Sequence, residues 1–530
     1  MTTIRWIAAL GLCLFGPEPL AQAAPERSTP ADVKAMLRSI SPQRIEATVR
    51  KLVGFGTRHT LSDTQSDDRG IGAARRWIKA QLDACAQQSG GRLKVELDSF
   101  TAPPNRRIAQ PTELVNVVAT LPGEQAESAG RIYVVSGHYD SMPSNVLDPK
   151  SDAPGADDDA SGTAAVIEMA CAMSRLHFDA TLVFMAVAGE EQGLVGSTHV
   201  AEEARKAGKN IAGMFTNDII GNSRAENGRV DRGRVRLFAE GVPDVKEMSD
   251  ELRTLVRTGG ENDTPTRELA RFIKEHAERD VAGMRVDLVW RRDRYLRGGD
   301  HAPFLNAGYA AVRFTEPAEN YHHQHQNVRV EGGVQYGDLP EFVDFGYIAQ
   351  VARVNAAALA ALAMAPAAPR GAQLETARLE NDTTLHWDAS TEPDLAGYRI
   401  VWRDTTAPLW QNHKDVGLVT RYSLPLSKDN VVFGVQAIDK DGNVSVASYP
   451  TPVRPPQPGG SEPASGQPAS GQPASGQPAS GQPASGQPAS GQPASGQPPG
   501  STKAPSPAKP PAPSQSPGSG QSPASPRPRA

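Results

Sequence analysis

Three consecutive aspartates, Asp157 to Asp159, stand between small residues in the run Gly-Ala-Asp-Asp-Asp-Ala-Ser-Gly. Like charges this close repel one another, and a bound divalent cation is the simplest partner that would hold them in a folded domain. A solvated acidic turn is the plainer interpretation of three aspartates taken alone. The neighbourhood favours a metal. Other side chains that bind metals or transfer protons flank the run: His138, Asp140, Glu190, Glu191 and Asp218.

A dinuclear metal site needs terminal ligands for each ion, one bridging carboxylate and one unligated base beside the attacking water. A metal-bound imidazole usually donates its other N–H to a carboxylate, and Asp140 is spaced to do this for His138. Glu190 and Glu191 are adjacent, so one can bind metal while the other transfers a proton. A solvated glutamate pair at the start of a helix, favoured by the helix dipole, is the alternative.

The elements that must hold these side chains alternate between strand and helix. Apolar runs predict strands that end just before the candidate groups, at 131–136, 181–188 and 213–216. Further strands are expected at 92–100, 113–121, 234–240 and 311–315. Helices are expected at 42–53, 70–85, 162–176, 193–206, 265–278 and 339–363, after a polar lead-in at 24–41. The predicted class is α/β, a mostly parallel mixed sheet sandwiched by helices, with catalytic groups at the carboxyl ends of the strands.

Four motifs, in this order along the chain, resemble those of peptidase family twenty-eight, the dizinc exopeptidases of the bacterial leucyl aminopeptidase and aminopeptidase Y type. The motifs are His138-Tyr-Asp140, Gly155-Ala-Asp-Asp-Asp-Ala-Ser-Gly162, Gly189-Glu-Glu-Gln-Gly-Leu-Val-Gly-Ser197 and Asn217-Asp-Ile-Ile-Gly221. The resemblance covers about residues 40–365. It implies a zinc-exopeptidase fold of the phosphorylase/hydrolase-like kind and two zinc ions per chain.

The resemblance also implies a role for each matched residue. Asp158 matches the carboxylate that bridges the two ions, and the peptide bond after it is often cis in the family. His138 and Asp218 match the terminal ligands of one zinc ion. Glu191 and a histidine later in the chain match those of the other ion, and Glu190 matches the general base.

The late histidine lies in the segment Asn320-Tyr-His-His-Gln-His-Gln-Asn-Val. The family usually has His-Thr there, with an aspartate four residues after the histidine. His323 has Asn327 at that spacing and is the preferred ligand. His325 has no such partner and is the alternative.

The ends of the chain carry different patterns. Arg5 precedes an apolar run at 6–15 and a small-x-small cleavage site at Ala21-Gln-Ala23, which predicts a signal peptide at 1–23 and export to the periplasm or medium. No later stretch is long and apolar enough to predict a membrane anchor. The zinc peptidase domain is assigned to 24–365.

After a linker near 364–372, short alternating strands predict a small β-sandwich at 366–453. Its strands are expected at 384–388, 397–403, 421–425, 430–439 and 445–449. Trp387 and the run Val435-Gln-Ala-Ile-Asp-Lys-Asp-Gly-Asn resemble a fibronectin type III domain. Pro-Ala-Ser-Gly-Gln repeats then predict a disordered tail at 454–530, a spacer that could contact a cell surface or polymer.

The net charge of the chain limits which classes of partner it is expected to bind. A formal net charge of -5 and a pI near 6.2 argue against a nucleic-acid partner. Cys85 and Cys171 either pair, as an exported protein allows, or stay buried as free thiols.

The predicted function is therefore an exported zinc aminopeptidase that removes N-terminal residues from peptides, with Glu190 as general base and Asp140 beside the metal. The alternatives are a glutaminyl cyclase-like enzyme, a carboxypeptidase- or deacylase-like zinc enzyme, and a non-catalytic surface-binding protein.

Overall fold

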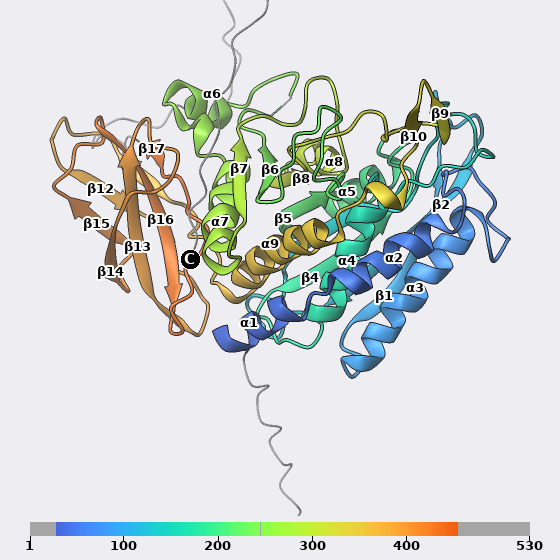
Figure 1. The fold of residues 1–530 in the computed structure, drawn as a ribbon. Helices are drawn as coiled ribbons and strands as arrows, with labels where there is room; N and C mark the ends of the chain where they lie inside the picture. The colour runs from blue at the N-terminus through green and yellow to red at the C-terminus, as the bar shows by residue number, and fades with distance from the viewer. Residues whose placement is uncertain (1–27, 244, 454–530) are drawn as a thin grey trace, which may run out of the picture. The chain divides into compact units, whose positions relative to one another are not determined.

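A computed structural model describes residues 28–243 and 245–453, and its main feature is one eight-stranded sheet (Figure 1). The strands are β1 (Lys94–Ala102), β2 (Thr112–Leu121), β3 (Arg131–His138), β4 (Thr181–Val187), β5 (Asn210–Asn217), β6 (Arg234–Ala239), β7 (Arg285–Val289) and β8 (Ala311–Thr315). Their order across the sheet is β1-β2-β4-β3-β5-β8-β6-β7. The central strands β4, β3, β5 and β8 are parallel, whereas β1, β2 and the β6–β8 pair run antiparallel. The predicted fold class is confirmed.

Helices cover both faces of this sheet. One face shares a large apolar core with α1 (Pro30–Ser39), α2 (Pro42–Val53), α3 (Gly70–Gln88), α4 (Ala160–Met173), α7 (Pro265–Asp280) and α9 (Phe345–Met364). On the other face, α5 (Val195–Lys206) and α8 (His301–Asn306) close a smaller core around Met185, Met214 and Phe304. Because helices cover both faces, the central strands read as nearly continuous apolar runs such as Thr-Leu-Val-Phe-Met-Ala-Val in β4.

Helix α9 is the one helix of the described residues that is long and apolar enough to cross a membrane. It contacts α2, α4 and α7 and is mostly buried among them. Its apolar composition is therefore explained by its place in the core of the domain.

Several elements differ from the sequence-based expectation. The lead-in contains α1, whose N-terminus is capped by Thr29 with Asp32 in a reciprocal pair of hydrogen bonds. The amphipathic α6 (Asp250–Arg257) and strand β7 were not predicted. The last helix begins at Phe345 instead of 339, because a short 3-10 helix, η2 (Pro340–Phe342), comes first. The other small elements are η1 (Gly260–Asn262) and the hairpin of β9 (Arg329–Glu331) and β10 (Val334–Tyr336).

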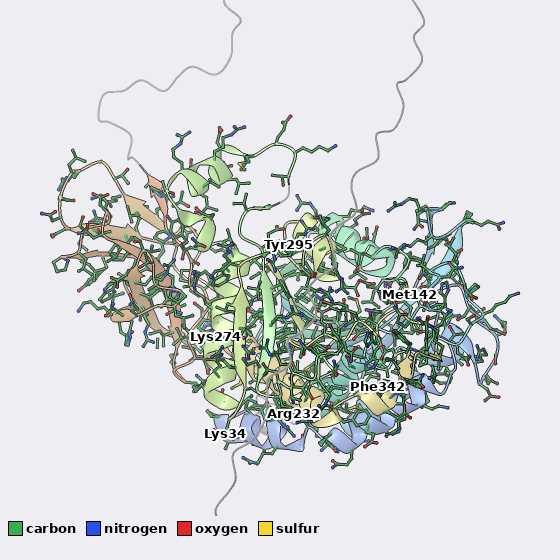
Figure 2. All side chains as sticks on the ribbon, turned by 45° about the horizontal axis from the view of Figure 1, so that its top comes forward. Lys34, Met142, Arg232, Lys274, Tyr295 and Phe342 are labelled. Carbon is green, nitrogen blue, oxygen red and sulfur yellow. A yellow bond between two sulfur atoms is a disulfide. The ribbon has the colours of Figure 1, made fainter. Side chains whose placement is uncertain are left out.

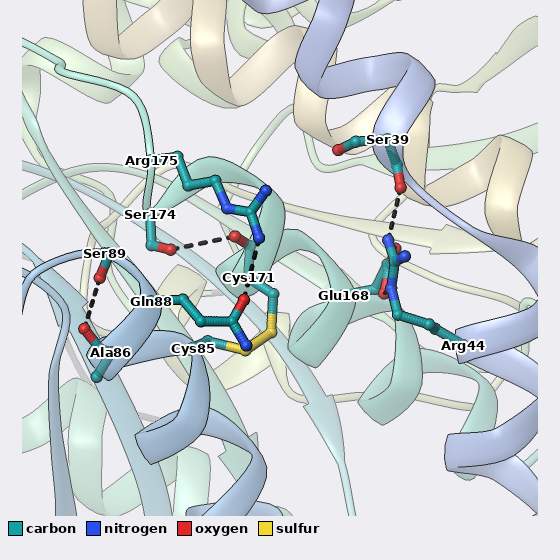
Figure 3. Close-up of a disulfide and its surroundings, with 10 residues drawn as sticks. All are labelled: Ser39, Arg44, Cys85, Ala86, Gln88, Ser89, Glu168, Cys171, Ser174 and Arg175. Carbon is teal, nitrogen blue, oxygen red and sulfur yellow. Dashed lines mark hydrogen bonds and ion pairs between the residues drawn. A yellow bond between two sulfur atoms is a disulfide. The ribbon is translucent and has the colours of Figure 1, made fainter.

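Cys85 of α3 and Cys171 of α4 form a disulfide (Figure 3). The two helices lie on the same face of the sheet, and the Cα atoms of the cysteines are 5.0 Å apart. Beside the bridge, Arg175 donates a hydrogen bond of 3.0 Å to Gln88 Oε1. The sequence left open whether these cysteines pair, and the structure shows that they form a disulfide.

Two small sheets follow the large sheet and its helices along the chain. Their strands are β11 (Gln373–Glu375), β12 (Thr383–His386), β13 (Leu395–Asp404), β14 (Asn412–Gly417), β15 (Arg421–Leu424), β16 (Val431–Asp439) and β17 (Thr451–Val453). The sheet orders are β15-β12-β11-β17 and β14-β13-β16. Leu385 and Ile400, one from each sheet, belong to a single buried cluster. The strand expected at 445–449 is replaced by isolated bridges. The expected signal peptide and repeat tail lie outside the described residues.

Candidate metal centre

The sheet topology brings the candidate groups together at one edge. His138 is the last residue of β3, Asp218 follows β5, and Glu190 and Glu191 follow β4. These three strands are parallel neighbours, so their carboxyl ends meet at the same edge. Asp158 reaches the same place from the loop before α4.

The start of α4 is fixed against the strands. Asp159 caps the helix by accepting a hydrogen bond of 2.9 Å from the Gly162 N–H. A side chain at Gly162 would clash with the Asn217 carbonyl oxygen, so glycine allows α4 to approach the end of β5. The peptide bond between Asp158 and Asp159 is cis, as the family resemblance implied.

Asp158 lies between two groups of donor atoms. His138 Nε2 is 3.1 Å from Asp158 Oδ1, and His325 Nε2 is 2.9 Å from Asp158 Oδ2. His138, Asp158 and Asp218 form one group, and Asp158, Glu191 and His325 form the other. Within each group, the ligand atoms lie within 4.8 Å of one another.

The donor set fits divalent metal ions. Each group offers one imidazole nitrogen and two carboxylates, which are donors that zinc accepts. His138, Asp158, Asp218 and Glu191 are all buried. Buried carboxylates this close together need positive charge, and two dications sharing Asp158 would supply it.

The structure brings His325, not His323, to this cluster. The His323 ring stacks on Phe342 of η2 (labelled in Figure 2), with ring centroids 3.8 Å apart. His323 lines a different pocket. The spacing to Asn327 misled the sequence-based choice, because Asn327 does not orient a histidine. Its side-chain oxygen accepts from the Ser144 N–H at 3.1 Å, and its own N–H donates to Ser144 Oγ at 2.9 Å.

Asp140 supports the site differently from the prediction. The Nδ1 of His138 lies 3.2 Å from the backbone oxygen of Asp140 and 3.5 Å from its carboxylate. That carboxylate accepts hydrogen bonds from Thr60 Oγ1 at 2.7 Å and from the Glu191 N–H at 3.2 Å. It also accepts from the Glu190 N–H at 3.3 Å. Asp140 therefore holds the glutamate loop as well as lying beside the imidazole.

Glu190 belongs to neither donor group but lines the same pocket. Burial raises the pKa of Glu190 well above its usual value. The nearby carboxylates of Asp218 and Glu191 raise this pKa further, while His138 acts in the opposite direction. A carboxyl group with a raised pKa next to the metal ligands is suited to accept and return a proton.

Sequence reasoning missed the buried arginine that holds Asp218. Arg313 of β8 is fully buried and lies 2.8 Å from Asp218 Oδ1 and 3.1 Å from Asp293 Oδ2. It is the one charged residue in the otherwise apolar and hydroxyl-bearing run Ala-Val-Arg-Phe-Thr. That isolated charge was the signal that could have identified it, since a buried arginine requires anionic partners.

Two further buried groups shape the loop that carries Asp158. Arg58 donates to the carbonyl oxygens of Tyr139, at 2.8 Å, and of Gly155, at 2.8 Å. Asp338 accepts hydrogen bonds from the Asp158 N–H at 2.8 Å and from the Asp157 N–H at 2.9 Å. No local sequence pattern marks Arg58 or Asp338, because their partners lie far away along the chain.

The cluster opens into a pocket of about 650 Å³. Its wall combines metal-binding candidates with side chains from two loops, one after β1 and one after β7. A pocket of this size can admit the end of a peptide.

Comparisons with known proteins found a matching family and similar chains. Residues 116–331 match the model of peptidase family M28. A probable zinc metalloprotease of the fungus Leptosphaeria maculans is 48% identical over 433 residues, which are 82% of this chain and 99% of that protein. One from Pyrenophora tritici-repentis is 47% identical over 79% of this chain and 87% of its own length. Among solved structures, Legionella pneumophila LapA is 20% identical with a TM-score of 0.44, over 65% of this chain and 80% of that chain.

Proposed function

We propose that this chain, which belongs to peptidase family M28 and is a zinc metalloprotease, works as an exported aminopeptidase. One observation carries the proposal. Asp158 is shared by two three-residue donor groups, while Glu190 lies beside both and belongs to neither. This is the arrangement that a dinuclear hydrolase with a separate general base requires.

We assign each ion its own ligands. His138 and Asp218 would hold one zinc ion, Glu191 and His325 would hold the other, and Asp158 would bridge them. Bound zinc would polarise the scissile carbonyl group and lower the pKa of the attacking water.

The residues of the chain perform the proton transfers. Glu190 accepts a proton from water as the new C–O bond forms, and then returns it to the nitrogen of the leaving amine as the C–N bond breaks. The Glu190 carboxyl group holds that proton between the two steps. The hydrogen bonds from the Glu190 and Glu191 N–H groups to Asp140 fix the backbone of this loop, from which Glu191 would bind zinc while Glu190 stays unligated.

Two features support the finer assignments. The reacting groups lie in a pocket, which suits attack at the end of a peptide more than in its middle. Export is supported by the N-terminal signal pattern and by the disulfide, since disulfides persist in oxidising compartments. A fractionation experiment that finds the full-length chain only in the cytoplasm would exclude export.

The Glu190→Gln variant tests the mechanism. We expect kcat to fall by about 10²–10⁴ on aminoacyl anilides, because the proton acceptor is gone. Zinc content should stay at the parent value, since Glu190 is not a ligand. Glu203→Gln is the matched control, because Glu203 is an exposed glutamate on α5 that pairs with Lys206.

The substrate panel tests the class of reaction. Peptides with a free N-terminus should be cleaved, and those with an acetylated N-terminus should not. Cleavage of blocked peptides from the carboxyl end, or release of pyroglutamate from a Gln peptide without hydrolysis, would replace the aminopeptidase proposal with one of its alternatives. A zinc chelator should abolish turnover, and added zinc should restore it.

A further inference from the structure

Four arginines line the pocket at the metal centre, beside its four carboxylates. Arg106 and Arg107 come from the loop after β1, and Arg294 and Arg297 come from the loop after β7. The apolar side chains in the same wall are few: Leu194, Ile219 and Leu296. A pocket that selects a large apolar residue would show the reverse balance.

Arg107 and Arg294 are engaged by structural partners. Arg107 donates a hydrogen bond to the backbone oxygen of Glu191. Arg294 has a side chain only 9% exposed and pairs with Asp293 and Glu319, each at 3.1 Å. Both guanidinium groups therefore hold the walls of the pocket.

The guanidinium group of Arg106 is free to bind a ligand. Its side chain is exposed at the pocket, and its guanidinium forms no hydrogen bond or ion pair with any residue of 28–243 or 245–453. The next residue, Arg107, joins the same loop to the Glu191 side of the metal centre.

Arg297 is only partly neutralised. Its side chain is one third exposed, and its Nη1 lies 2.9 Å from Glu319 Oε2. Glu319 is shared, because Arg236 and Arg294 also pair with it, at 2.5 Å and 3.1 Å. These guanidinium groups lower the pKa of Glu319 to about 2, even though burial alone would raise it. Arg297 therefore shares its carboxylate with two other guanidinium groups, which leaves its own charge only partly offset.

Most carboxylates of the metal centre are not available to these arginines. Asp158, Asp218 and Glu191 are the proposed zinc ligands, so bound dications would offset their charge, and Glu190 is the other carboxylate that lines the pocket. The two arginine loops flank the centre from different sides, since Gly299, next to the Arg297 loop, lies against Asp218 and Arg313. A substrate that reaches the metal centre through this pocket would therefore pass beside the guanidinium groups of Arg106 and Arg297.

We propose that Arg106 and Arg297 bind a carboxylate of the peptide substrate, so that the enzyme prefers anionic peptides. This inference rests on the proposed function, because it names the substrates of the same site. A planar guanidinium group forms paired, charge-assisted hydrogen bonds with a carboxylate. The carboxylate has two sources: the side chain of an N-terminal Glu or Asp, or the free C-terminus of a short peptide.

Matched substrates separate these sources in the zinc-loaded, full-length enzyme. Glu-anilide against Gln-anilide tests the acidic side chain, because an anilide has no free carboxyl terminus. Leu-Gly against Leu-Gly-amide tests the terminal carboxylate. We expect the carboxylate form to have the higher kcat/KM in at least one pair, by about tenfold to a hundredfold.

Arginine variants then connect the preference to the proposed residues. In Arg106→Gln or Arg297→Gln, the ratio within that pair should fall toward one, and Arg297→Glu should favour an N-terminal Lys. Arg253→Gln should keep the parent ratio, because Arg253 is an exposed arginine on α6 outside the pocket. Ratios near one in the parent, or a ratio unchanged in both arginine variants, would overturn the proposal.

A binding measurement distinguishes this inference from the proposed function. Calorimetric titration of zinc-loaded Glu190→Gln with the same carboxylate and amide pairs needs no turnover. Suppose that binding shows an arginine-dependent preference for the carboxylate form while the parent enzyme has no peptidase activity. That result would support this inference and exclude the aminopeptidase assignment. Hydrolysis by the parent enzyme without any carboxylate preference in binding or rate would support the aminopeptidase assignment and exclude this inference.

Discussion

Replacing each of two histidines in one loop tests the central claim about the metal centre. His325 Nε2 lies 2.9 Å from Asp158 Oδ2 and 3.2 Å from Glu191 Oε1, so it completes the second donor group. His323, two residues earlier, stacks on Phe342 instead. The His325→Ala and His323→Ala variants therefore remove the same chemical group from neighbouring positions with different surroundings.

The two variants should differ in metal content, activity and stability. His325→Ala removes one of three protein donors of the second group, so the metal content should fall from about two ions per chain toward one. Losing several kcal/mol of transition-state stabilisation lowers kcat by about a hundredfold or more. His323→Ala should keep metal content and kcat, and should lower the unfolding free energy by about 0.5–1.5 kcal/mol through the lost ring stacking.

Elemental analysis after gel filtration, initial rates on an aminoacyl anilide and denaturant titration measure these three quantities. The reasoning would be refuted if His323→Ala lost a metal ion while His325→Ala kept both. Equal metal loss in both variants would also refute it, since the structure separates the two rings into different pockets.

Three further predictions concern the support of the site. Arg313→Met should lower the unfolding free energy by about 3–5 kcal/mol, measured with denaturant, because two buried carboxylates lose their shared cation. Removing the bond between Cys85 and Cys171, by reduction or by a double Ala substitution, should cost about 2–5 kcal/mol in the same assay. Burial lowers the pKa of His301 from 6.5 to about 4, so the unfolded chain binds a proton that the folded chain refuses between these values. Stability should therefore decrease as pH is lowered from 6.5 to 4, by on the order of 3 kcal/mol, and His301→Asn should flatten that slope in denaturant titrations at stepped pH.

The sequence determined most strands of the large sheet, most of the helices that cover them and most of the candidate site. The reason is that strands covered on both faces must be apolar, so a polar residue directly after such a run marks the sheet edge where ligands bind. His138, Asp218 and the glutamate pair each stand at such a point, and the aspartate run stands before the next helix. Local pattern was enough for these residues because each lies next to the element that positions it.

Only the tertiary structure decided the choice between His323 and His325. Both histidines lie in one irregular loop, where no periodicity fixes the direction of a side chain. His325 adopts a left-handed backbone conformation, with φ 51°, and its side chain reaches Asp158. The spacing to Asn327 carried no such information, because the partner of Asn327 is Ser144, more than a hundred residues away along the chain.

The same distinction explains what else the sequence left open. The pairing of Cys85 with Cys171, the grip of Arg313 on Asp218 and the arginines at the pocket all join segments that are distant in sequence. Local periodicity records whether a residue is buried, but it does not record which residue it meets. The chain alone therefore determined the elements and the chemistry at their ends, and the packing of the elements decided which of those side chains meet.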